Sequence, residues 1–277
     1  MPIATLSRLS VAALLLLGTG DAAQAAIGDW IGNGNARVRL LASGVDASGR
    51  LAAGIEIELD RGWKTYWRTP GDAGVPPQAD FSASTNLGGN AEIAFPVPHR
   101  LDDGFATTNV YEGSVILPVA MPVVDPASPA RLVVGLDIGV CDEVCIPAHF
   151  DLSLDVDPTA KDEEAGRLLA AAYAKLPGAP EPDAFAVESF IRAGGTDRKP
   201  VFSVDIVAPG ADKADVFVEG PADWFPAPPK LVSGDAARAT YTVEFSRTGS
   251  KVPIGGNEFR VTVVTPERSM ESRLTLK

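Results

Sequence analysis

Most of the chain alternates apolar and polar residues with a period of two, and this alternation constrains the fold more than any other feature. A period of two puts every second side chain on the same face of a β-strand, so one face can be buried while the other stays wet. In the first half, the alternating runs are Ala36 to Leu40, Ala53 to Leu59, Ser114 to Val119 and Arg131 to Ile138. Turn signals separate them, such as Ala47-Ser48-Gly49, Pro70-Gly71-Asp72 and Asn86 to Asn90. The pattern predicts an antiparallel β-sandwich that ends near Asp157.

The period then changes between Asp162 and Leu176. Apolar residues recur there at helical spacing, after acidic residues in the first turn. These apolar residues are Leu168, Leu169, Ala172, Tyr173 and Leu176. A proline-rich stretch, Pro177 to Pro182, would break this helix and is typical of a linker.

Strand patterns return after the linker. The alternating runs are Ala184 to Ile191, Val201 to Val207, Asp215 to Glu219, Thr240 to Ser246, Phe259 to Val264, and Ser272 to Leu276. This block of about 95 residues has the right size for another small sandwich. We therefore expect an all-β fold with two immunoglobulin-like β-sandwich domains, at 26–158 and 183–277, joined by a short helix and linker at 159–182.

Residues 1–25 have the anatomy of a secretory signal peptide. Arg8 lies in a short polar start, Val11 to Leu17 is apolar, and Ala23-Gln24-Ala25 is a small-residue cleavage pattern. The apolar run is shorter than the roughly 20 residues that span a bilayer. We expect an exported chain that is cleaved after Ala25 and has no direct membrane span thereafter.

Charge and motifs exclude several classes of function. A net charge of −12 repels phosphate backbones and anionic lipid heads, so we expect neither nucleic acid nor a membrane surface as a partner. The sequence contains no Walker loop, G-x-S-x-G elbow or H-E-x-x-H motif. We expect no cofactor. A copper(I) site built from His99, His149 and the two cysteine thiolates stays open as an alternative.

The two cysteines, Cys141 and Cys145, are separated by three residues in "VCDEVCIP". Export puts them in an oxidising compartment, where a disulfide would form. A structural bridge is one interpretation, but closing a loop of about five residues contributes roughly 2 kcal/mol, against about 4.7 kcal/mol for a hundred-residue loop. So small a ring also cannot join two sheets. The energetics favour a redox pair, although a structural bridge stays open.

Geometry adds a constraint on this segment. Extended positions four apart are about 13 Å from each other, whereas a disulfide needs Cα atoms within roughly 7 Å. The chain must therefore turn between the cysteines, and a turn at the end of a sheet exposes sulfur. The intervening acids, Asp142 and Glu143, disfavour a thiolate, so we do not expect unusually acidic thiols.

Four motifs occur in an order that resembles a known family. They are "GWKTYWRTPGDAGVPP" from Gly62, "FPVPHRLDDGF" from Phe95, "YEGSVILPV" from Tyr111 and "CDEVCIPA" from Cys141. Together they are similar to the amino-terminal periplasmic domain of the thiol:disulfide interchange protein DsbD. The three-residue cysteine spacing resembles its ScsB-type relatives, which are linked to copper tolerance.

The resemblance implies a function and a set of site residues. Cys141 and Cys145 match the redox-active pair, and it implies that Cys145 is the more accessible sulfur. Asp102 and Asp103 match acidic residues beside the disulfide, with a role in proton transfer. Phe105 matches an aromatic residue of a protective cap, and Tyr66 an active-site tyrosine. Strand alternation supports Tyr66, because it faces away from Trp63 and Trp67, which we expect in the core.

The resemblance also implies partners. Full members of the family continue into a transmembrane domain and a thioredoxin-like domain, which this sequence lacks. We therefore expect a separate membrane-embedded thiol reductase of DsbD or CcdA type as the electron donor, and periplasmic thioredoxin-like proteins as acceptors. The leading hypothesis is a periplasmic thiol–disulfide oxidoreductase of the protein-disulfide reductase type. The alternatives are a non-catalytic β-sandwich binding module with a structural disulfide, and a periplasmic copper-handling protein.

Overall fold

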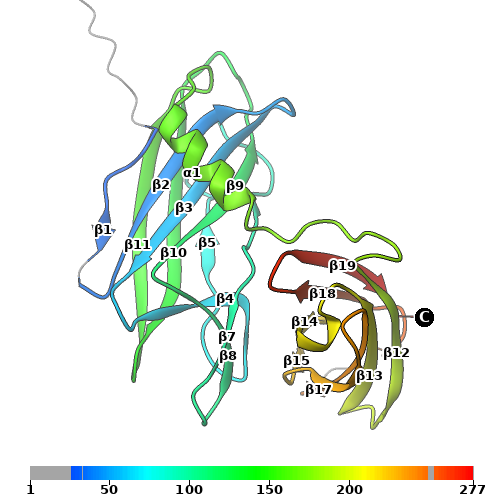
Figure 1. The fold of residues 1–277 in the computed structure, drawn as a ribbon. Helices are drawn as coiled ribbons and strands as arrows, with labels where there is room; N and C mark the ends of the chain where they lie inside the picture. The colour runs from blue at the N-terminus through cyan, green and yellow to red at the C-terminus, as the bar shows by residue number, and fades with distance from the viewer. Residues whose placement is uncertain (1–25, 33, 249–252, 277) are drawn as a thin grey trace, which may run out of the picture.

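The computed structural model describes residues 26–32, 34–248 and 253–276. Figure 1 shows two groups of strands lying next to each other, joined by one helix and an extended segment. We call them the first β unit, residues 26–156, and the second β unit, residues 185–276, because each surrounds a hydrophobic core. The expected signal peptide, residues 1–25, lies outside the described residues.

The first β unit consists of two sheets whose strands all pair antiparallel. The five-stranded sheet has the order β1 (Ile31–Gly32), β2 (Ala36–Val45), β3 (Arg50–Leu59), β9 (Ser114–Pro122) and β6 (Glu92–Ile93). The six-stranded sheet has the order β11 (Cys145–Val156), β10 (Ala130–Cys141), β4 (Lys64–Gly71), β8 (Thr107–Glu112) and β7 (His99–Asp102), with β5 (Gln78–Asp80) paired to β10. The core lies between them, since inward residues of both sheets belong to one buried cluster.

The helix α1 (Glu163–Tyr173) covers the outer face of the five-stranded sheet (Figure 1). It begins where the Asp162 side chain accepts a hydrogen bond from the Ala165 N–H at 2.7 Å, which caps the first turn. Leu169 is buried against β3 at Gly54, where an added Cβ would lie 2.7 Å from Leu169 Cδ2. A glycine at this position of the strand therefore lets the helix approach the sheet.

The second β unit also consists of two antiparallel sheets. One contains β12 (Ala186–Gly195), β13 (Pro200–Val207), β17 (Arg238–Arg247), β15 (Trp224–Pro226) and β16 (Lys230–Gly234). The other has the order β14 (Asp215–Glu219), β18 (Glu258–Val264) and β19 (Ser269–Thr275), and a 3-10 turn, η1 (Ala211–Lys213), precedes β14. The centre of this unit is aromatic: the rings of Phe202, Phe245 and Phe259 lie 5.3 to 5.7 Å apart.

The proline-rich segment after α1 follows the second β unit closely. The Gly178 N–H donates to the Ser269 carbonyl at 2.9 Å, and the Glu271 N–H donates to the Gly178 carbonyl at 3.0 Å. These bonds pair the segment with β19 as an isolated bridge. The expected linker is therefore fixed to the second unit by backbone hydrogen bonds.

The structure confirms the mostly β character that the alternation predicts. Every alternating run predicted in the second half overlaps a strand, and the run at Asp215–Glu219 coincides with β14. The predicted helix forms but is shorter than its apolar pattern, because it ends at Tyr173 before Pro177. Strands β15 and β16 were not predicted, since they flank the prolines from Pro226 to Pro229. Among the described residues, no helix combines the length and apolarity that crossing a membrane requires.

Candidate redox site

The two cysteines occupy the tip of the β10–β11 hairpin. Cys141 is the last residue of β10 and Cys145 the first of β11, and the two are paired in register. They form a disulfide with a Cα–Cα distance of 4.1 Å. The three residues between them, at 142–144, are an exposed turn closed by the Asp142 N–H, which donates to the Val144 carbonyl. The turn that the sequence required is therefore present.

The two sulfurs differ in their surroundings. Cys141 is fully buried and packs with Tyr66, Val110 and Leu101 in a small cluster separate from the main core. Cys145 is exposed at the surface of the hairpin. A nucleophile from solvent or from a partner can therefore reach Cys145, while Cys141 is shielded by the protein.

Tyr66, on β4, points its hydroxyl at the disulfide. The hydroxyl donates to Cys141 Sγ at 3.0 Å and also lies 3.2 Å from Cys145 Sγ. Burial raises the pKa of the Tyr66 hydroxyl, and the negative charge of Asp103 raises it further. The phenol therefore keeps its proton at neutral pH, and its hydroxyl can donate a hydrogen bond to the sulfurs.

Two glycines make the slot that holds the Tyr66 ring. At Gly74, whose φ is +110°, an added Cβ would lie 2.3 Å from Cε1 of the ring. At Gly139, on β10, an added Cβ would lie 3.3 Å from Cδ2. Larger residues at these positions would displace the ring, so the two glycines set where the hydroxyl can reach.

The turn between β7 and β8 carries the predicted acidic and cap residues. The Asp103 carboxylate accepts hydrogen bonds from the N–H groups of Phe105 and Ala106, both at 3.0 Å, and Asp102 accepts from the N–H of Gly104 at 2.9 Å. The two backbone bonds and the nearby positive charge of Lys64 lower the pKa of Asp103. The turn is thus held by its own carboxylates, and Asp103 carries a negative charge near Tyr66.

Phe105 is fully exposed at the tip of this turn, so its ring packs against nothing in the part of the chain that the structure describes. Three further apolar residues are exposed close to the hairpin. Val75 lies beside Gly139, and Val144 and Ile146 flank Cys145 in the chain; their exposed fractions are 47%, 70% and 44%. Sequence reasoning missed these three, although Val144 and Ile146 stand within the "VCDEVCIP" segment. Exposed apolar groups of this kind are typical of a protein-docking surface.

The two histidines do not form a metal cluster with the cysteines. His149, on β11, pairs instead with Asp137 at 2.8 Å and Asp151 at 3.2 Å, and these bonds raise its pKa. His99 begins β7, paired with Val110. Within the described residues, no group of three or more histidine, cysteine, aspartate or glutamate side chains is arranged to hold a metal ion.

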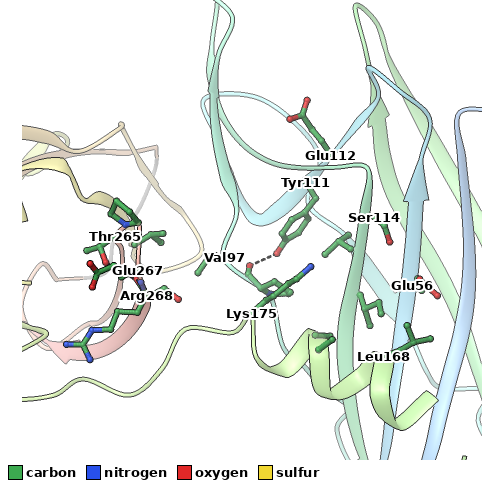
Figure 2. A pocket seen from close by; sticks show the side chains of 18 residues that line it. Glu56, Val97, Tyr111, Glu112, Ser114, Leu168, Lys175, Thr265, Glu267 and Arg268 are labelled. Atoms are coloured by element: carbon green, nitrogen blue, oxygen red, sulfur yellow. Dashed lines mark hydrogen bonds between the residues drawn. The ribbon is translucent and has the colours of Figure 1, made fainter. Parts of the chain in front are cut away.

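A cavity of about 490 Å³ opens where both β units meet α1 (Figure 2). Tyr111 and Val97 form its wall in the first unit, Lys175 follows α1, and Thr265 and Arg268 come from the second unit. The Tyr111 hydroxyl donates to the Pro96 carbonyl at 2.7 Å beside it. Neither cysteine lines this cavity, so it is distinct from the disulfide.

Comparison with known proteins identifies what this arrangement resembles. Residues 38–156 match the family model of the N-terminal domain of the thiol:disulfide interchange protein DsbD. Among solved structures, the chain is similar to the N-terminal periplasmic domain of ScsB from Proteus mirabilis, with a TM-score of 0.72 and 22% sequence identity over 91% of this chain and 98% of that chain. At this identity the likeness concerns the fold alone. No curated protein matches the chain.

Proposed function

Because residues 38–156 form a DsbD N-terminal-like domain that carries a disulfide at its tip, we propose that the protein performs thiol–disulfide exchange in the periplasm. In this proposal, Cys141 and Cys145 relay electrons from a membrane-embedded thiol reductase to disulfides of periplasmic thioredoxin-like proteins. The single observation that carries it is the contrast between the exposed Cys145 and the buried Cys141, whose sulfur accepts a hydrogen bond from Tyr66.

The reducing half of the cycle begins at Cys145. A thiolate of the donor attacks Cys145 Sγ, a mixed disulfide forms, and the Cys141–Cys145 bond breaks so that Cys141 leaves as a thiolate. A second donor thiolate then attacks the donor sulfur of the mixed disulfide and releases Cys145. The donor ends as a disulfide, and the pair has gained two electrons.

The oxidising half runs the same chemistry towards the acceptor. The Cys145 thiolate attacks the acceptor disulfide, and one acceptor sulfur leaves as a thiolate that takes up a proton. Cys141 then attacks Cys145 Sγ, which closes the intramolecular disulfide and releases the second acceptor sulfur. The acceptor is reduced to a dithiol, and the pair returns to the state seen in the structure.

Tyr66 assists whenever Cys141 is a thiolate. A hydrogen bond to a charged sulfur is stronger than one to a neutral sulfur, so the Tyr66 hydroxyl favours departure of Cys141 from the disulfide. The negative charge of Asp103 disfavours a thiolate at Cys141, so it lowers the reactivity of the cysteine pair when no partner is bound. Its lowered pKa keeps Asp103 ionised at neutral pH, so Asp103 has no proton to donate and is a weaker proton acceptor than an ordinary carboxylate. Asp102 and Asp103 remain our candidates for proton transfer. Phe105 remains our candidate for a cap residue, but its ring is fully exposed in this oxidised form and covers neither sulfur, so the turn would have to move to form the cap.

We also propose the domain division that the sequence suggested. Two immunoglobulin-like β-sandwich domains, at 26–158 and 183–277, would be joined by the helix and linker at 159–182, after a signal peptide at 1–25. The two hydrophobic clusters support this division, although Phe217 of the second unit belongs to the cluster of the first.

The experiment that tests the function is trapping of a mixed disulfide, combined with the reduction potential of the pair. A Cys141→Ser variant leaves the accessible Cys145 thiol without its resolving partner and should accumulate a mixed disulfide with an oxidised thioredoxin-like protein. Cys145→Ser is the matched control, because its remaining thiol is buried and should trap far less. A potential below roughly −300 mV together with no trapped complex would identify a structural bridge instead.

A further inference from the structure

The second β unit contacts the first chiefly through β14, with a further ion pair from Glu271 of β19, and these contacts fall on the strands that carry the redox site. Glu219 binds Arg68 and Thr69 of β4, and Asp215 binds Arg100 of β7. The Phe217 ring packs edge-on against Trp67, with ring centroids 5.4 Å apart. Because β14 is an edge strand of its sheet, it is free to lie against the first unit.

The contact with β4 begins one residue after Tyr66. The pairing of β4 with β8 is regular from Lys64 to Tyr66 and then irregular until Gly71. Trp67, Arg68 and Thr69 lie within this irregular stretch and make the contacts with β14. The second β unit therefore contacts β4 in the stretch where the pairing of β4 with β8 is irregular.

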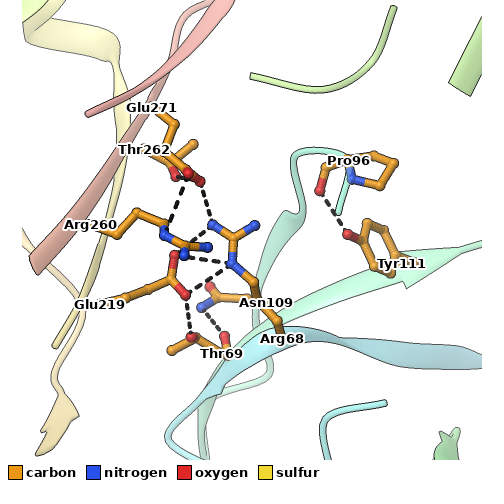
Figure 3. A network of polar contacts seen from close by, with 9 residues as sticks. All are labelled: Arg68, Thr69, Pro96, Asn109, Tyr111, Glu219, Arg260, Thr262 and Glu271. Atoms are coloured by element: carbon orange, nitrogen blue, oxygen red, sulfur yellow. Dashed lines mark hydrogen bonds and ion pairs between the residues drawn. The ribbon is translucent and has the colours of Figure 1, made fainter. Parts of the chain in front are cut away.

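Arg68 is the centre of a mostly buried ionic network (Figure 3). Its guanidinium donates to Glu219 at 2.9 and 2.6 Å and to Glu271 at 2.5 Å, while Arg260 lies 3.4 Å from Glu271. The side chains of Arg68, Glu219 and Glu271 are only 15%, 15% and 19% exposed. Burial alone would lower the pKa of Arg68, but the bonds to Glu219 and the charges of both glutamates raise it. The charges are thus well matched across the interface.

The contact with β7 lies two residues before the turn that carries Asp103 and Phe105. The Arg100 guanidinium pairs with Asp215, donates to the Val216 carbonyl at 2.7 Å and lies over the Phe217 ring at 4.4 Å. Here burial outweighs the attraction, because it lowers the pKa of Arg100 and raises that of Asp215. This pair therefore specifies how the strands dock more than it stabilises them.

A small cavity of about 20 Å³ lies between Trp67, Arg100 and Phe217. That is room for about one water molecule, so the interface is closely packed. A closely packed interface transmits displacements instead of absorbing them.

We propose that the second β unit is a positioning element of the redox site, with Arg68 and Arg100 as positioning residues that act through Tyr66 and through the Asp103–Phe105 turn. Strand β14 holds β4 and β7 at a fixed separation, and this fixes the Tyr66 hydroxyl against Cys141 and the turn beside it. The inference rests on the proposed exchange function of the pair.

The test uses the full mature chain and a Glu219→Gln variant, which keeps the shape of the side chain but removes its charge. The control is Glu188→Gln, which removes an ion pair with Arg238 inside the second unit. We expect Glu219→Gln to slow reduction of the disulfide by dithiothreitol roughly three- to tenfold. The absorbance titration of the Tyr66 phenol, obtained as the difference from a Tyr66→Phe chain, should move as well. A purely structural role would lower the melting temperature but leave both readouts unchanged.

Milder variants keep the test decisive if Glu219→Gln does not fold. Thr69→Val removes only the 2.9 Å hydrogen bond to Glu219, and Arg68→Lys keeps the charge without the two-pronged geometry. Folded variants that react at the wild-type rate, with an unshifted Tyr66 titration, would overturn the inference. If the wild-type pair itself exchanges with no thioredoxin-like protein, the proposed function fails instead, so the two failures are distinguishable.

Discussion

Strand β4 serves two regions whose physical character is opposite. Tyr66 reaches the disulfide at the β10–β11 tip, where Cys145 is exposed, and the charge of Asp103 on the exposed β7–β8 turn acts on it. We call this region the tip. Two residues later, Arg68 enters a buried ionic network with the second β unit. The tip exposes reactive and apolar groups, whereas the interface buries matched charges and aromatic rings. Of these two regions, the interface therefore contributes more to stability and the tip more to reactivity, and β4 joins them.

The largest effect is expected from Trp67→Ala, which acts on the interface. Trp67 is fully buried and packs against Phe217, so truncation leaves a cavity at the junction of both units. The free energy of unfolding should fall by about 3–5 kcal/mol, measured by denaturant titration of the oxidised chain. A loss below about 1 kcal/mol would contradict the assignment of stability to this region.

The next largest effect is expected at the tip, where Tyr66→Phe should change the reduction potential of the disulfide. Losing a hydrogen bond to a charged sulfur costs about 1.5–3 kcal/mol, which corresponds to a reduction potential roughly 30–60 mV more negative. Reduction by dithiothreitol should also slow about tenfold, because Cys141 becomes a poorer leaving group.

Tyr111→Phe is the matched control for this change. Tyr111 is also buried on the first unit, but its hydroxyl bonds the Pro96 carbonyl instead of sulfur. It should lose some stability and keep the wild-type potential. Equal potentials for Tyr66→Phe and the wild type would remove Tyr66 from the redox chemistry.

The difference between the two regions also explains what the sequence could predict. Local patterns predicted most of the long strands, the turn between the cysteines and a Tyr66 that faces away from Trp67, but not the short strands β1, β5, β6, β7, β15 and β16, nor β8 and β11. They did not predict that both faces of β4 are covered, so that Tyr66 and Trp67 are 3% and 0% exposed. The partners of Arg68 lie 151 and 203 residues away, at a distance where no local periodicity carries information. The glycine slot around Tyr66 likewise exists only once Gly74 and Gly139 are brought together.

Phe105→Ala tests whether the exposed ring shields the sulfurs or helps a partner protein to dock. Because the ring is fully exposed, its removal should change stability by less than about 0.5 kcal/mol and leave reduction by dithiothreitol unchanged. Exchange with a thioredoxin-like protein should slow, if the ring contributes to the docking surface with Val144 and Ile146. Val124→Ala, at another exposed valine, is the control. Faster reduction by dithiothreitol in Phe105→Ala would show that the ring shields the sulfurs in solution, contrary to its position here.

The smallest effect should come from His149, which lies on β11 away from both the interface and the sulfurs' hydrogen bonds. Hydrogen bonds to Asp137 and then to Asp151 raise its pKa above the ordinary 6.5. A histidine whose pKa is raised by folding contributes stability that is complete below the unfolded value and is lost as the pH rises through the folded value. The melting temperature of His149→Gln should thus fall below that of the wild type in acid and approach it in alkali.

Melting curves between about pH 5 and about pH 8 measure this difference. The gap should be small, because the side chain is 53% exposed, and added salt should narrow it further. Asp137→Asn should reproduce more of the gap than Asp151→Asn, since the shorter bond, at 2.8 Å, is to Asp137. Parallel curves for His149→Gln and the wild type would mean that the histidine gains no proton affinity on folding. In the described residues, the His149 side chain pairs with Asp137 and Asp151 of β10 and β11. The reduction potential should therefore stay at the wild-type value in all three variants, which separates a local surface charge effect from the proposed coupling through Tyr66 and Arg68.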